Sequence, residues 1–369
     1  MMSDKKENVP AAGWTTRPGM GARISLPRNT RTCSLLCCFV VLALIFANAA
    51  RQGSGAIVKS TTEPEVFAPG VISGGAHDSA PAFTPDGKTV YFSRSNGDLS
   101  LIVESHRKKE KWSPPVLAPF SGRWNDMEPS MSPDGKFLIF VSSRPTQPGG
   151  SPIDGHFNKR TWPGGGGNLW RVDKTTKGWS TPVRLPDLIN KTTSTFAPSV
   201  VGDGSVYFME SNEETDRFRI YRAQWRNGGF EAPVPAGFSN GDWSSVDPAV
   251  AAAESYAVFS SSRPPAKDMD LFITFRCGAV WSNPTHLGDV VNSPTSDAEA
   301  RFSPDGQTLY FSSERRIKAE QPLSEKTSRQ VLKDFEWNNG LYNIWQVSLK
   351  PWLEGLPSAS CAQGSGSSK

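Results

Sequence analysis

Charged side chains recur at fixed places in five similar stretches of this sequence. The stretches align from Phe83, Met131, Val200, Val250 and Phe302. Five positions earlier, at what we call the minus-five position, stand Asp78, Asp126, Thr195, Ser245 and Asp297. Three positions earlier, at the minus-three position, stand Ala80, Glu128, Ala197, Asp247 and Glu299. Carboxylates that converge from such repeats could bind a divalent cation, act as general acid and base, or pair as in a glycoside hydrolase.

An arginine accompanies three of these acids. At the end of the second predicted strand, the aligned residues are Asn96, Arg144, Asn212, Arg263 and Arg315. The copies with an arginine are those with an acid at minus-three, which predicts the pairs Glu128–Arg144, Asp247–Arg263 and Glu299–Arg315. We favour a structural role for these ion pairs and their hydrogen bonds. The alternative is a ligand or catalytic site at Asp126, Glu128, Asp247, Asp297 and Glu299, although no motif supplies an activated nucleophile or a base with a defined partner.

Each stretch has the composition of a β-hairpin. In three of them Pro-Asp-Gly forms the turn, because proline fixes φ, aspartate bonds its own backbone and glycine accepts positive φ. The run after the turn is β-branched and aromatic, as at 89–92, which is typical of strands. A third strand follows, as at 168–170, and then a fourth, opened by an aromatic residue with a proline three positions later, as at Trp112 and Pro115. Four strands in repeats of about fifty residues predict the blades of a β-propeller.

The fifth copy lacks the fourth strand after Trp345, and a match lies at the other end of the chain. Segment 64–69, Pro-Glu-Val-Phe-Ala-Pro, resembles Pro-Val-Leu-Ala-Pro at 115–119. We expect this segment to complete the last blade, because pairing the two ends removes an exposed sheet edge and locks the ring. The sequence therefore predicts an all-β fold, a five-bladed β-propeller closed by an N-terminal strand.

The repeat also resembles a known family. Ser-Pro-Asp-Gly followed by a strand ending in Tyr-Phe-Ser-Ser-x-Arg, as at 303–315, is similar to the repeat of the TolB-like, WD-type β-propeller family. The resemblance covers residues 64–352 and implies the propeller fold. It implies no single function, since this repeat occurs in binding proteins, in accessory domains of peptidases and in some lyases.

Two insertions distinguish this chain from a plain repeat. They lie between Arg144 and Asn168 and between Arg315 and Asn343, where each replaces the loop after a second strand. We expect both to rise from the face of the propeller that bears the carboxylates, as recognition elements. The candidate contacts are His156, Phe157, Arg160, Trp162, Phe335, Glu336 and Trp337. The alternative for the glycine-rich first insertion is a disordered loop, and the second is expected to form a short helix at 325–335.

The first fifty residues have the order of an export signal. Segment 33–50 is apolar and uncharged, arginines precede it, and it ends in Ala47-Asn48-Ala49. We favour a cleaved signal peptide, with a retained single-span anchor as the alternative. Either would export the remaining chain, where an oxidising compartment would let Cys277 and Cys361 pair. The excess positive charge lies in this first segment, so the rest of the chain has no overall basic surface for nucleic acid.

These patterns predict a signal peptide or membrane anchor at 1–50, a linker at 51–62, the propeller at 63–353 and a flexible C-terminal tail at 354–369. We expect a monomeric, periplasmic or secreted binding protein that recognises a protein, peptide or carbohydrate at its channel face. The alternative is an exported hydrolase or lyase acting on glycans. The residues predicted to contact the ligand are Asp78, Asp126, Glu128, Arg144, His156, Trp162, Asp247, Arg263, Asp297, Glu299 and Arg315. No cofactor and no metal-ligand spacing are predicted, and a divalent cation at the channel mouth is left open. Membrane contact is expected only through an uncleaved N-terminal segment.

Overall fold

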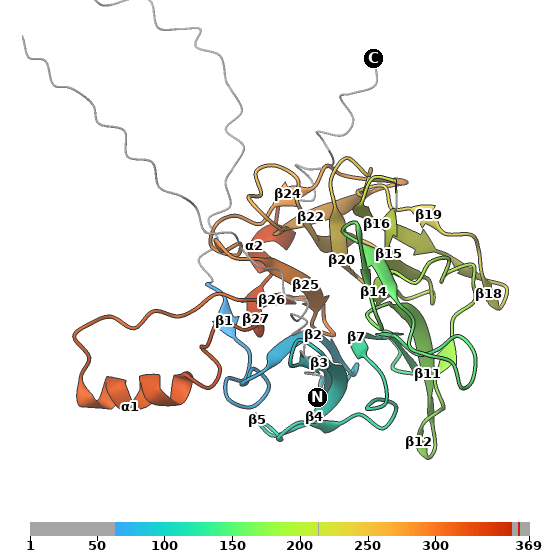
Figure 1. Cartoon of the computed structure of the whole chain (residues 1–369). Helices are drawn as coiled ribbons and strands as arrows, with labels where there is room; N and C mark the ends of the chain where they lie inside the picture. Colours follow the sequence, from blue (N-terminus) through green and yellow to red (C-terminus); the bar gives the residue numbers. More distant parts are fainter. Residues whose placement is uncertain (1–62, 213, 356–360, 362–369) are drawn as a thin grey trace, which may run out of the picture. The chain divides into compact units, whose positions relative to one another are not determined.

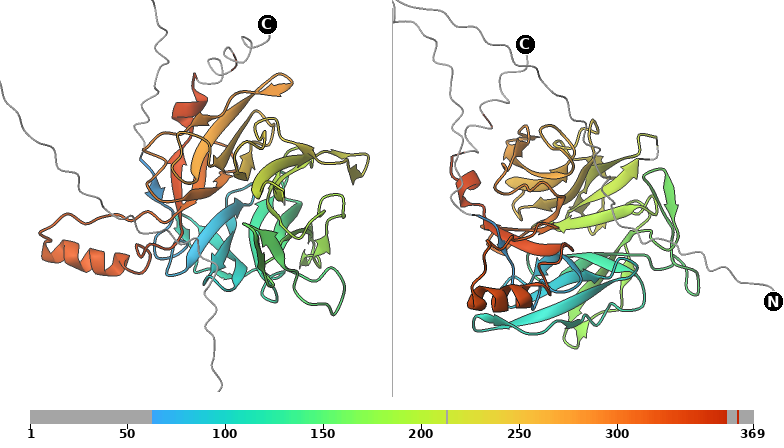
Figure 2. Two further views of the ribbon diagram at one scale, coloured as in Figure 1. Left: turned by 45° about the horizontal axis from the view of Figure 1, so that its top comes forward. Right: turned by 60° about the vertical axis from the view of Figure 1, so that its left-hand side comes forward.

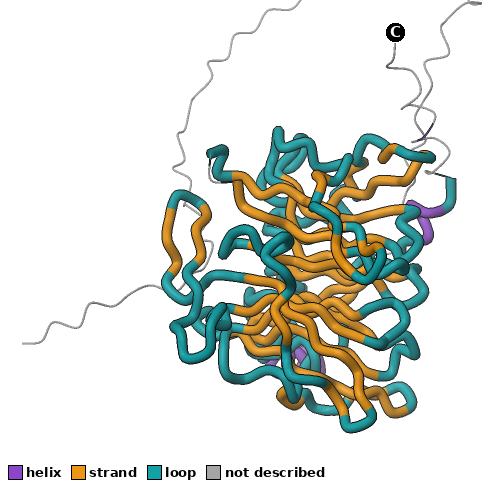
Figure 3. The backbone as a smooth tube through the Cα atoms, turned by 90° about the vertical axis from the view of Figure 1, so that its right-hand side faces the viewer, coloured by secondary structure: helices purple, strands orange, loops and turns teal. Residues whose placement is uncertain are grey.

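The five repeats form the five blades of a β-propeller. The structure is a computed structural model that describes residues 63–355, apart from 213, and Cys361. Its sheets are arranged as blades around a common centre (Figures 1 and 2), and Figure 3 shows how strands make up most of the described chain. The predicted fold class is therefore confirmed. The predicted leader and linker at 1–62 lie outside the described residues.

Each blade is an antiparallel sheet whose strands follow one another from the centre outward. The innermost strands are β2 (His77–Phe83), β7 (Asp126–Met131), β14 (Thr195–Val200), β20 (Ser245–Val250) and β25 (Asp297–Phe302). The second strands are β3 (Thr89–Ser95), β8 (Phe137–Ser142), β15 (Val206–Asn212), β21 (Tyr256–Ser261) and β26 (Thr308–Ser313). The third strands are β4 (Ser100–Lys108), β11 (Asn168–Thr175), β16 (Arg217–Ala223), β22 (Asp270–Cys277) and β27 (Asn343–Ser348).

The outer strands are two residues long, and small hairpins accompany them. The outer strands are β6 (Val116–Leu117), β13 (Val183–Arg184), β19 (Val234–Pro235), β24 (Thr285–His286) and β1 (Glu65–Val66). The hairpin strands are β5 (Lys111–Trp112), β12 (Gly178–Trp179), β17 (Trp225–Arg226), β18 (Gly229–Phe230) and β23 (Val280–Trp281). The aromatic residues expected to open the fourth strand thus lie in these hairpins, and the outer strand begins after the proline.

The predicted closure is confirmed by β1. Glu65 pairs with Gln346 and Val66 with Trp345, so β1 is the outer strand of the blade that contains β25, β26 and β27. The amide of Phe67 continues this ladder by donating to the carbonyl of Ile344 at 2.8 Å. The two ends of the propeller are therefore joined by backbone hydrogen bonds.

Buried aromatic side chains pack the blades against one another. Each second strand contributes one phenylalanine with no exposed surface: Phe92, Phe140, Phe208, Phe259 and Phe311. These side chains are large, and burying each contributes about 2 to 3 kcal/mol. The innermost strands, which face the channel, are thus supported by a close-packed layer of buried side chains.

A β-bulge interrupts each innermost strand at the minus-three position. The five residues there have positive φ, at 48° for Ala80, 52° for Glu128, 50° for Ala197, 54° for Asp247 and 52° for Glu299. The strand register shifts at this point in all five blades. Such a left-handed conformation is unusual for residues other than glycine, so the surrounding sheet must hold it in place. The bulge re-aims the minus-three side chain.

Candidate functional site

The three acids at minus-three belong to one buried cluster at the centre of the ring. Oε2 of Glu128 accepts a hydrogen bond from the amide of Ala197 in the next blade at 2.6 Å. In the same way, Oδ2 of Asp247 accepts from the amide of Glu299 at 3.1 Å. Glu128 and Asp247 thus each bond the minus-three residue of the following blade. The bulge makes this bond available by turning that amide out of its own strand ladder.

Burial and mutual repulsion raise the pKa values of two of these acids. Burial, with the nearby charges of Asp247 and Glu299, raises the pKa of Glu128 to about 8. Burial and the charge of Glu299 raise the pKa of Asp247 to about 7. Carboxylates that cannot all ionise together share protons, so at neutral pH the cluster holds both protonated and ionised carboxyl groups. This is the electrostatic condition for a group that donates a proton beside one that accepts it.

Arg301 completes the cluster, and the sequence analysis missed it. Its side chain is 94% buried, since only 6% of the residue is exposed, and its charge opposes the rise in pKa of Glu128 and Asp247. Nη1 donates to the carbonyl of Ala300 at 2.8 Å, while Nε and Nη2 have no hydrogen-bond partner among the described residues. The other blades carry only small residues at this position, which leaves room for the guanidinium: Ala82, Ser130, Ser199 and Ala249. The sequence signal that could have identified Arg301 is an arginine at a position where the other four repeats have alanine or serine.

His77 and Tyr342 lie at the mouth of the channel. The amide of Tyr342 donates to Nδ1 of His77 at 3.2 Å, and their rings lie 5.7 Å apart. Burial lowers the pKa of His77, with the charge of Glu299 opposing it. Burial also raises the pKa of Tyr342, to which the charges of Glu299 and Asp247 add. His77 is therefore a neutral, partly buried residue of the mouth, and Tyr342 joins it from the second insertion.

The predicted arginine pairs are wrong in their partners. Arg144 lies 2.8 Å from Asp126, and Arg315 lies 2.7 Å from Asp297, so the arginines meet the minus-five acids of their own blades. Glu128 and Glu299 at minus-three do not pair with them. The reason is the β-bulge at minus-three, which turns the minus-three side chain toward the channel. The minus-five residue precedes the bulge and stays paired with the second strand, as Asp126 does with Ser142.

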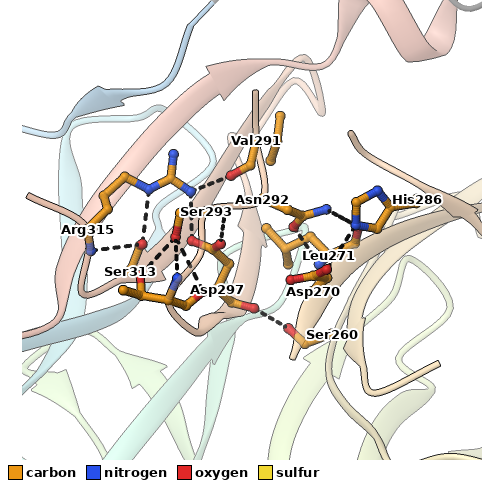
Figure 4. A network of polar contacts seen from close by, with 11 residues as sticks. Ser260, Asp270, Leu271, His286, Val291, Asn292, Ser293, Asp297, Ser313 and Arg315 are labelled. Carbon is orange, nitrogen blue, oxygen red and sulfur yellow. Dashed lines mark hydrogen bonds and ion pairs between the residues drawn. The ribbon is translucent and has the colours of Figure 1, made fainter. Parts of the chain in front are cut away.

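The minus-five acids are structural in three blades. Asp78, Asp126 and Asp297 have no exposed surface, and Arg94 takes the place of the missing arginine by pairing with Asp78 at 2.7 Å. Figure 4 shows the fifth blade, where Arg315 also donates to the carbonyl of Val291. In the fourth blade the minus-five residue is Ser245, and Arg263 donates to its hydroxyl at 3.4 Å and to the carbonyl of Phe238 at 3.0 Å. These arginines fasten the loop before each innermost strand to the second strand.

Replacing Asp126 by alanine should cost about 3 to 5 kcal/mol of unfolding free energy, because it leaves Arg144 buried without a countercharge. Asp126 also accepts from Ser142 at 2.7 Å and Ser121 at 2.9 Å, so two further donors lose their acceptor. Urea unfolding measures the loss. The matched control is Ser245→Ala, at the same position of a blade without a carboxylate, which should cost about 1 kcal/mol. Equal effects of the two variants would contradict a structural role for Asp126.

The first insertion folds as an ordered hairpin and not as a disordered loop. Its strands β9 (Gly155–Phe157) and β10 (Arg160–Trp162) pair, and Trp162 stacks on Phe157 with ring centres 5.5 Å apart. Phe157 packs in turn on Phe196, the residue after the minus-five position of the third blade. The backbone of His156 bonds Ser194 at 2.9 Å, beside that same position. The hairpin therefore lies on the channel-mouth face, as predicted, with the side chains of His156 and Arg160 exposed.

The second insertion carries a helix that stands away from the blades. Helix α1 (Glu325–Asp334) begins at Ser324, whose side chain accepts from the amide of Thr327 at 3.1 Å. Figures 1 and 2 show α1 at the end of a long loop, outside the blades. The predicted helix is thus confirmed. Trp337, predicted as a contact residue, is only 6% exposed, and its carbonyl accepts from Asn343, so it is an anchor of the insertion.

Neither a metal cluster nor a membrane-spanning helix is found in the described part of the chain. No group of three or more His, Cys, Asp or Glu side chains there is placed to hold a metal ion, and a divalent cation at the channel mouth stays a prediction. None of the helices at 63–355 is long and apolar enough to cross a membrane. A disulfide joins Cys277 to Cys361, whose Cα atoms lie 5.5 Å apart.

Comparisons with known proteins found similar solved structures but no match by sequence. No family model and no curated protein sequence matches the chain. Similar solved structures include a putative TolB from Agrobacterium tumefaciens, with 16% identity and a TM-score of 0.43 over 64% of this chain and 70% of that chain. TolB from Acinetobacter baumannii has 16% identity and a TM-score of 0.41 over 74% of this chain, which spans 54% of that protein. A thermostable family-43 glycoside hydrolase has 14% identity and a TM-score of 0.44 over 67% of this chain and 86% of its own. TolB propellers are thus among the similar structures, while membership of the WD-type repeat family is not confirmed by sequence.

Proposed function

We propose that this protein is an exported binding protein that recognises a protein or peptide ligand at the channel-mouth face. One observation carries the proposal: α1 and the loop before it expose apolar side chains outside the packed blades. Leu332 is 69% exposed, Phe335 62% and Ile317 53%. Apolar side chains gathered on a projecting element are typical of protein interaction sites. A carbohydrate ligand is less favoured, because the exposed side chains of the helix offer apolar contact where a sugar needs hydrogen-bonding groups.

Export is supported by the disulfide. Disulfides persist in oxidising compartments and are rare in the cytosol. The bond between Cys277 and Cys361 agrees with the signal-like order of residues 33–50. We propose that the protein acts in the periplasm or outside the cell.

Catalysis is the second candidate, and the channel cluster favours it. Glu128, Asp247 and Glu299 are not paired with the arginines of their own blades, and Glu128 and Asp247 have raised pKa values. Glycoside hydrolases use such carboxylates as proton donor, base or nucleophile. Asp126 and Asp297, predicted as catalytic candidates, are engaged by Arg144 and Arg315. The cluster itself is closed, since Glu128 and Asp247 are less than 10% exposed, so a glycan would need the mouth at His77 and Tyr342 to open.

The two candidates are separated by one set of variants. The full-length protein is screened on peptide and glycan arrays, and the affinity for a selected ligand is then measured by calorimetry. Leu332→Glu with Phe335→Glu should weaken binding about tenfold or more, because each loses apolar burial worth about 1.5 to 3 kcal/mol. Val183→Glu, at an exposed outer strand, is the matched control and should change nothing. Turnover of a glycoside by the wild type that Glu128→Gln abolishes would contradict the binding-only proposal.

A further inference from the structure

A groove between the third and fourth blades lies away from the channel mouth. It has a volume of about 510 Å³, and its walls are the outer strand β19 with the following residues 236–237 and the hairpin residues Ala279–Trp281. Its floor includes Tyr207, Arg222 and Glu254. Glu254 belongs to the turn after β20, and such turns lie on the face opposite the loops that enter the innermost strands. Pockets of this volume are common ligand sites.

The equivalent groove between the first and second blades is filled. There the indole of Trp179 donates to the hydroxyl of Tyr91 at 3.1 Å, and the two rings lie 5.8 Å apart. Trp281 and Tyr207 occupy the same positions in the fourth and third blades, but they do not bond each other. The hydroxyl of Tyr207 donates to Glu254 at 2.6 Å, and Trp281 packs on Phe238 at 5.1 Å. The carboxylate of Glu254 has taken the place of the indole, and the groove stays open.

The floor of this groove is held by hydrogen bonds and ion pairs to Arg222. Arg222 donates to both carboxylate oxygens of Glu254, at 2.6 and 3.1 Å. Burial alone would raise the pKa of Glu254, but the bonds from Arg222 and Tyr207 outweigh it and lower that pKa. Glu254 is therefore ionised at neutral pH and its charge is matched by Arg222. Arg222 has a second carboxylate partner in Asp203, which lies 3.4 Å away and does not line the groove.

Arg276 is the cation in the groove that is left for a ligand. Its guanidinium carbon lies 5.4 Å from the centre of the Trp281 ring, and Nε donates to the carbonyl of Gly278 at 3.0 Å. No carboxylate of the described residues forms an ion pair with it, and its side chain is exposed. Holding the guanidinium over the indole reduces its freedom, so an arriving carboxylate meets a positioned donor.

The walls offer apolar contact and a free strand edge beside this cation. Val234 is 57% exposed and Val280 is 63% exposed. β19 is the last strand of its sheet, so its outer backbone groups have no strand partner among the described residues, and Pro235 can offer only its carbonyl. An extended peptide can lie along such an edge, with alternate side chains directed into a groove.

We propose that this groove binds an extended peptide segment of a partner protein in which an Asp or Glu lies next to an aliphatic residue. The acidic side chain pairs with Arg276, and the aliphatic one packs between Val234 and Val280. The proposal does not rest on the channel-mouth function, because the two sites lie at opposite ends of the blades and share no residue.

A phage-displayed library of random nonapeptides tests the proposal on the full-length protein. Wild-type protein should enrich peptides with Asp or Glu beside Leu, Ile or Val. Arg276→Glu should abolish that enrichment, and a synthetic peptide from the wild-type selection should bind this variant at least about tenfold more weakly. Lys174→Glu is the matched control, because Lys174 lies over Trp179 in the filled groove, 4.7 Å from the ring centre. It should leave binding unchanged, and thermal unfolding shows that each variant is folded.

Three results would overturn the proposal. One is a selection that enriches no acidic peptides. Another is equal binding of the selected peptide to wild type and Arg276→Glu. The third is loss of peptide binding in the variant with Leu332→Glu and Phe335→Glu while Arg276→Glu still binds, which would assign the peptide to the channel-mouth face and leave the groove unused.

Discussion

Deleting residues 61–70 should abolish cooperative folding of the whole propeller. The deletion removes β1, and with it the pairing of Glu65 and Val66 to β27 and the bond from Phe67 to Ile344. It also removes the Phe67 side chain, whose ring lies 5.0 Å from Tyr310 and 5.7 Å from Trp112. Loss of such a buried phenylalanine costs about 3 to 5 kcal/mol by itself. The total loss is comparable to the whole stability of a typical domain, about 5 to 15 kcal/mol.

The measurement is thermal and urea unfolding, followed by circular dichroism and tryptophan fluorescence. Deletion of residues 51–60, equal in length and next to it in the chain, is the matched control and should leave the transition unchanged. Phe67→Ala tests the side chain alone and should lower stability without abolishing the transition. Equal unfolding curves for the two deletions would mean that β1 contributes nothing to stability, and would contradict the prediction.

The fold could be predicted from the sequence because its signals are local and repeated. A Pro-Asp-Gly turn fixes a hairpin, and five hairpins at similar intervals fix the number of blades. Even the long-range pairing of β1 with β27 could be predicted, since the missing strand of the fifth repeat has one visible match in the chain. Comparing the repeats with one another thus predicted a contact between distant parts of the chain, which a single repeat could not have done.

The three acids of the channel cluster were predicted from the sequence, but their contacts and the buried Arg301 were not. The alignment identified Glu128, Asp247 and Glu299, yet it assigned them arginines that bond the minus-five residues of their blades, which are Asp126, Ser245 and Asp297. Covariation between repeats shows that two positions change together, but it does not show which of two acids on one strand the arginine meets. That choice is made by the bulge at minus-three, and no residue type marks the bulge, since alanine, aspartate and glutamate all occupy it.

The groove at Arg276 could not be predicted for a different reason. Trp179 and Trp281 occupy the same place in their repeats, so the repeat pattern does not distinguish them. What separates them is Glu254, which lies in another blade and takes the hydroxyl of Tyr207. The difference between a filled and an open groove therefore depends on one contact between residues far apart in the sequence.

The propeller should become less stable as the pH rises from about 5 to 9, and Glu128→Gln should remove much of this loss. The pKa of Glu128 is raised to about 8 in the folded protein, so folding takes up a proton at any pH between its ordinary value and 8. The stability from that proton is fully present below about pH 4.5 and is lost as the pH rises through 8. Since one pKa unit corresponds to about 1.4 kcal/mol, the loss amounts to several kcal/mol. Asp247→Asn should act in the same direction over a window that ends near pH 7.

Other buried groups also have shifted pKa values, so the comparison must be between variant and wild type at each pH. Burial raises the pKa of Asp78 and Asp126 and lowers the pKa of His77, and these groups are common to both proteins. Urea unfolding at pH 5, 7 and 9 should show Glu128→Gln gaining stability on wild type as the pH rises. Asp134→Asn is the matched control. Burial raises the pKa of this turn aspartate, but the hydrogen bonds from Lys136 and Ser132 together outweigh burial and lower the pKa to about 2, so the difference from wild type should be constant from pH 5 to 9. A constant difference for Glu128→Gln as well would mean that Glu128 is ionised in the folded protein, and Glu128 would then hold no proton for acid catalysis. A difference that grows with pH would instead show that these carboxyl groups are kept at the channel at the expense of stability, which is expected where they serve a function.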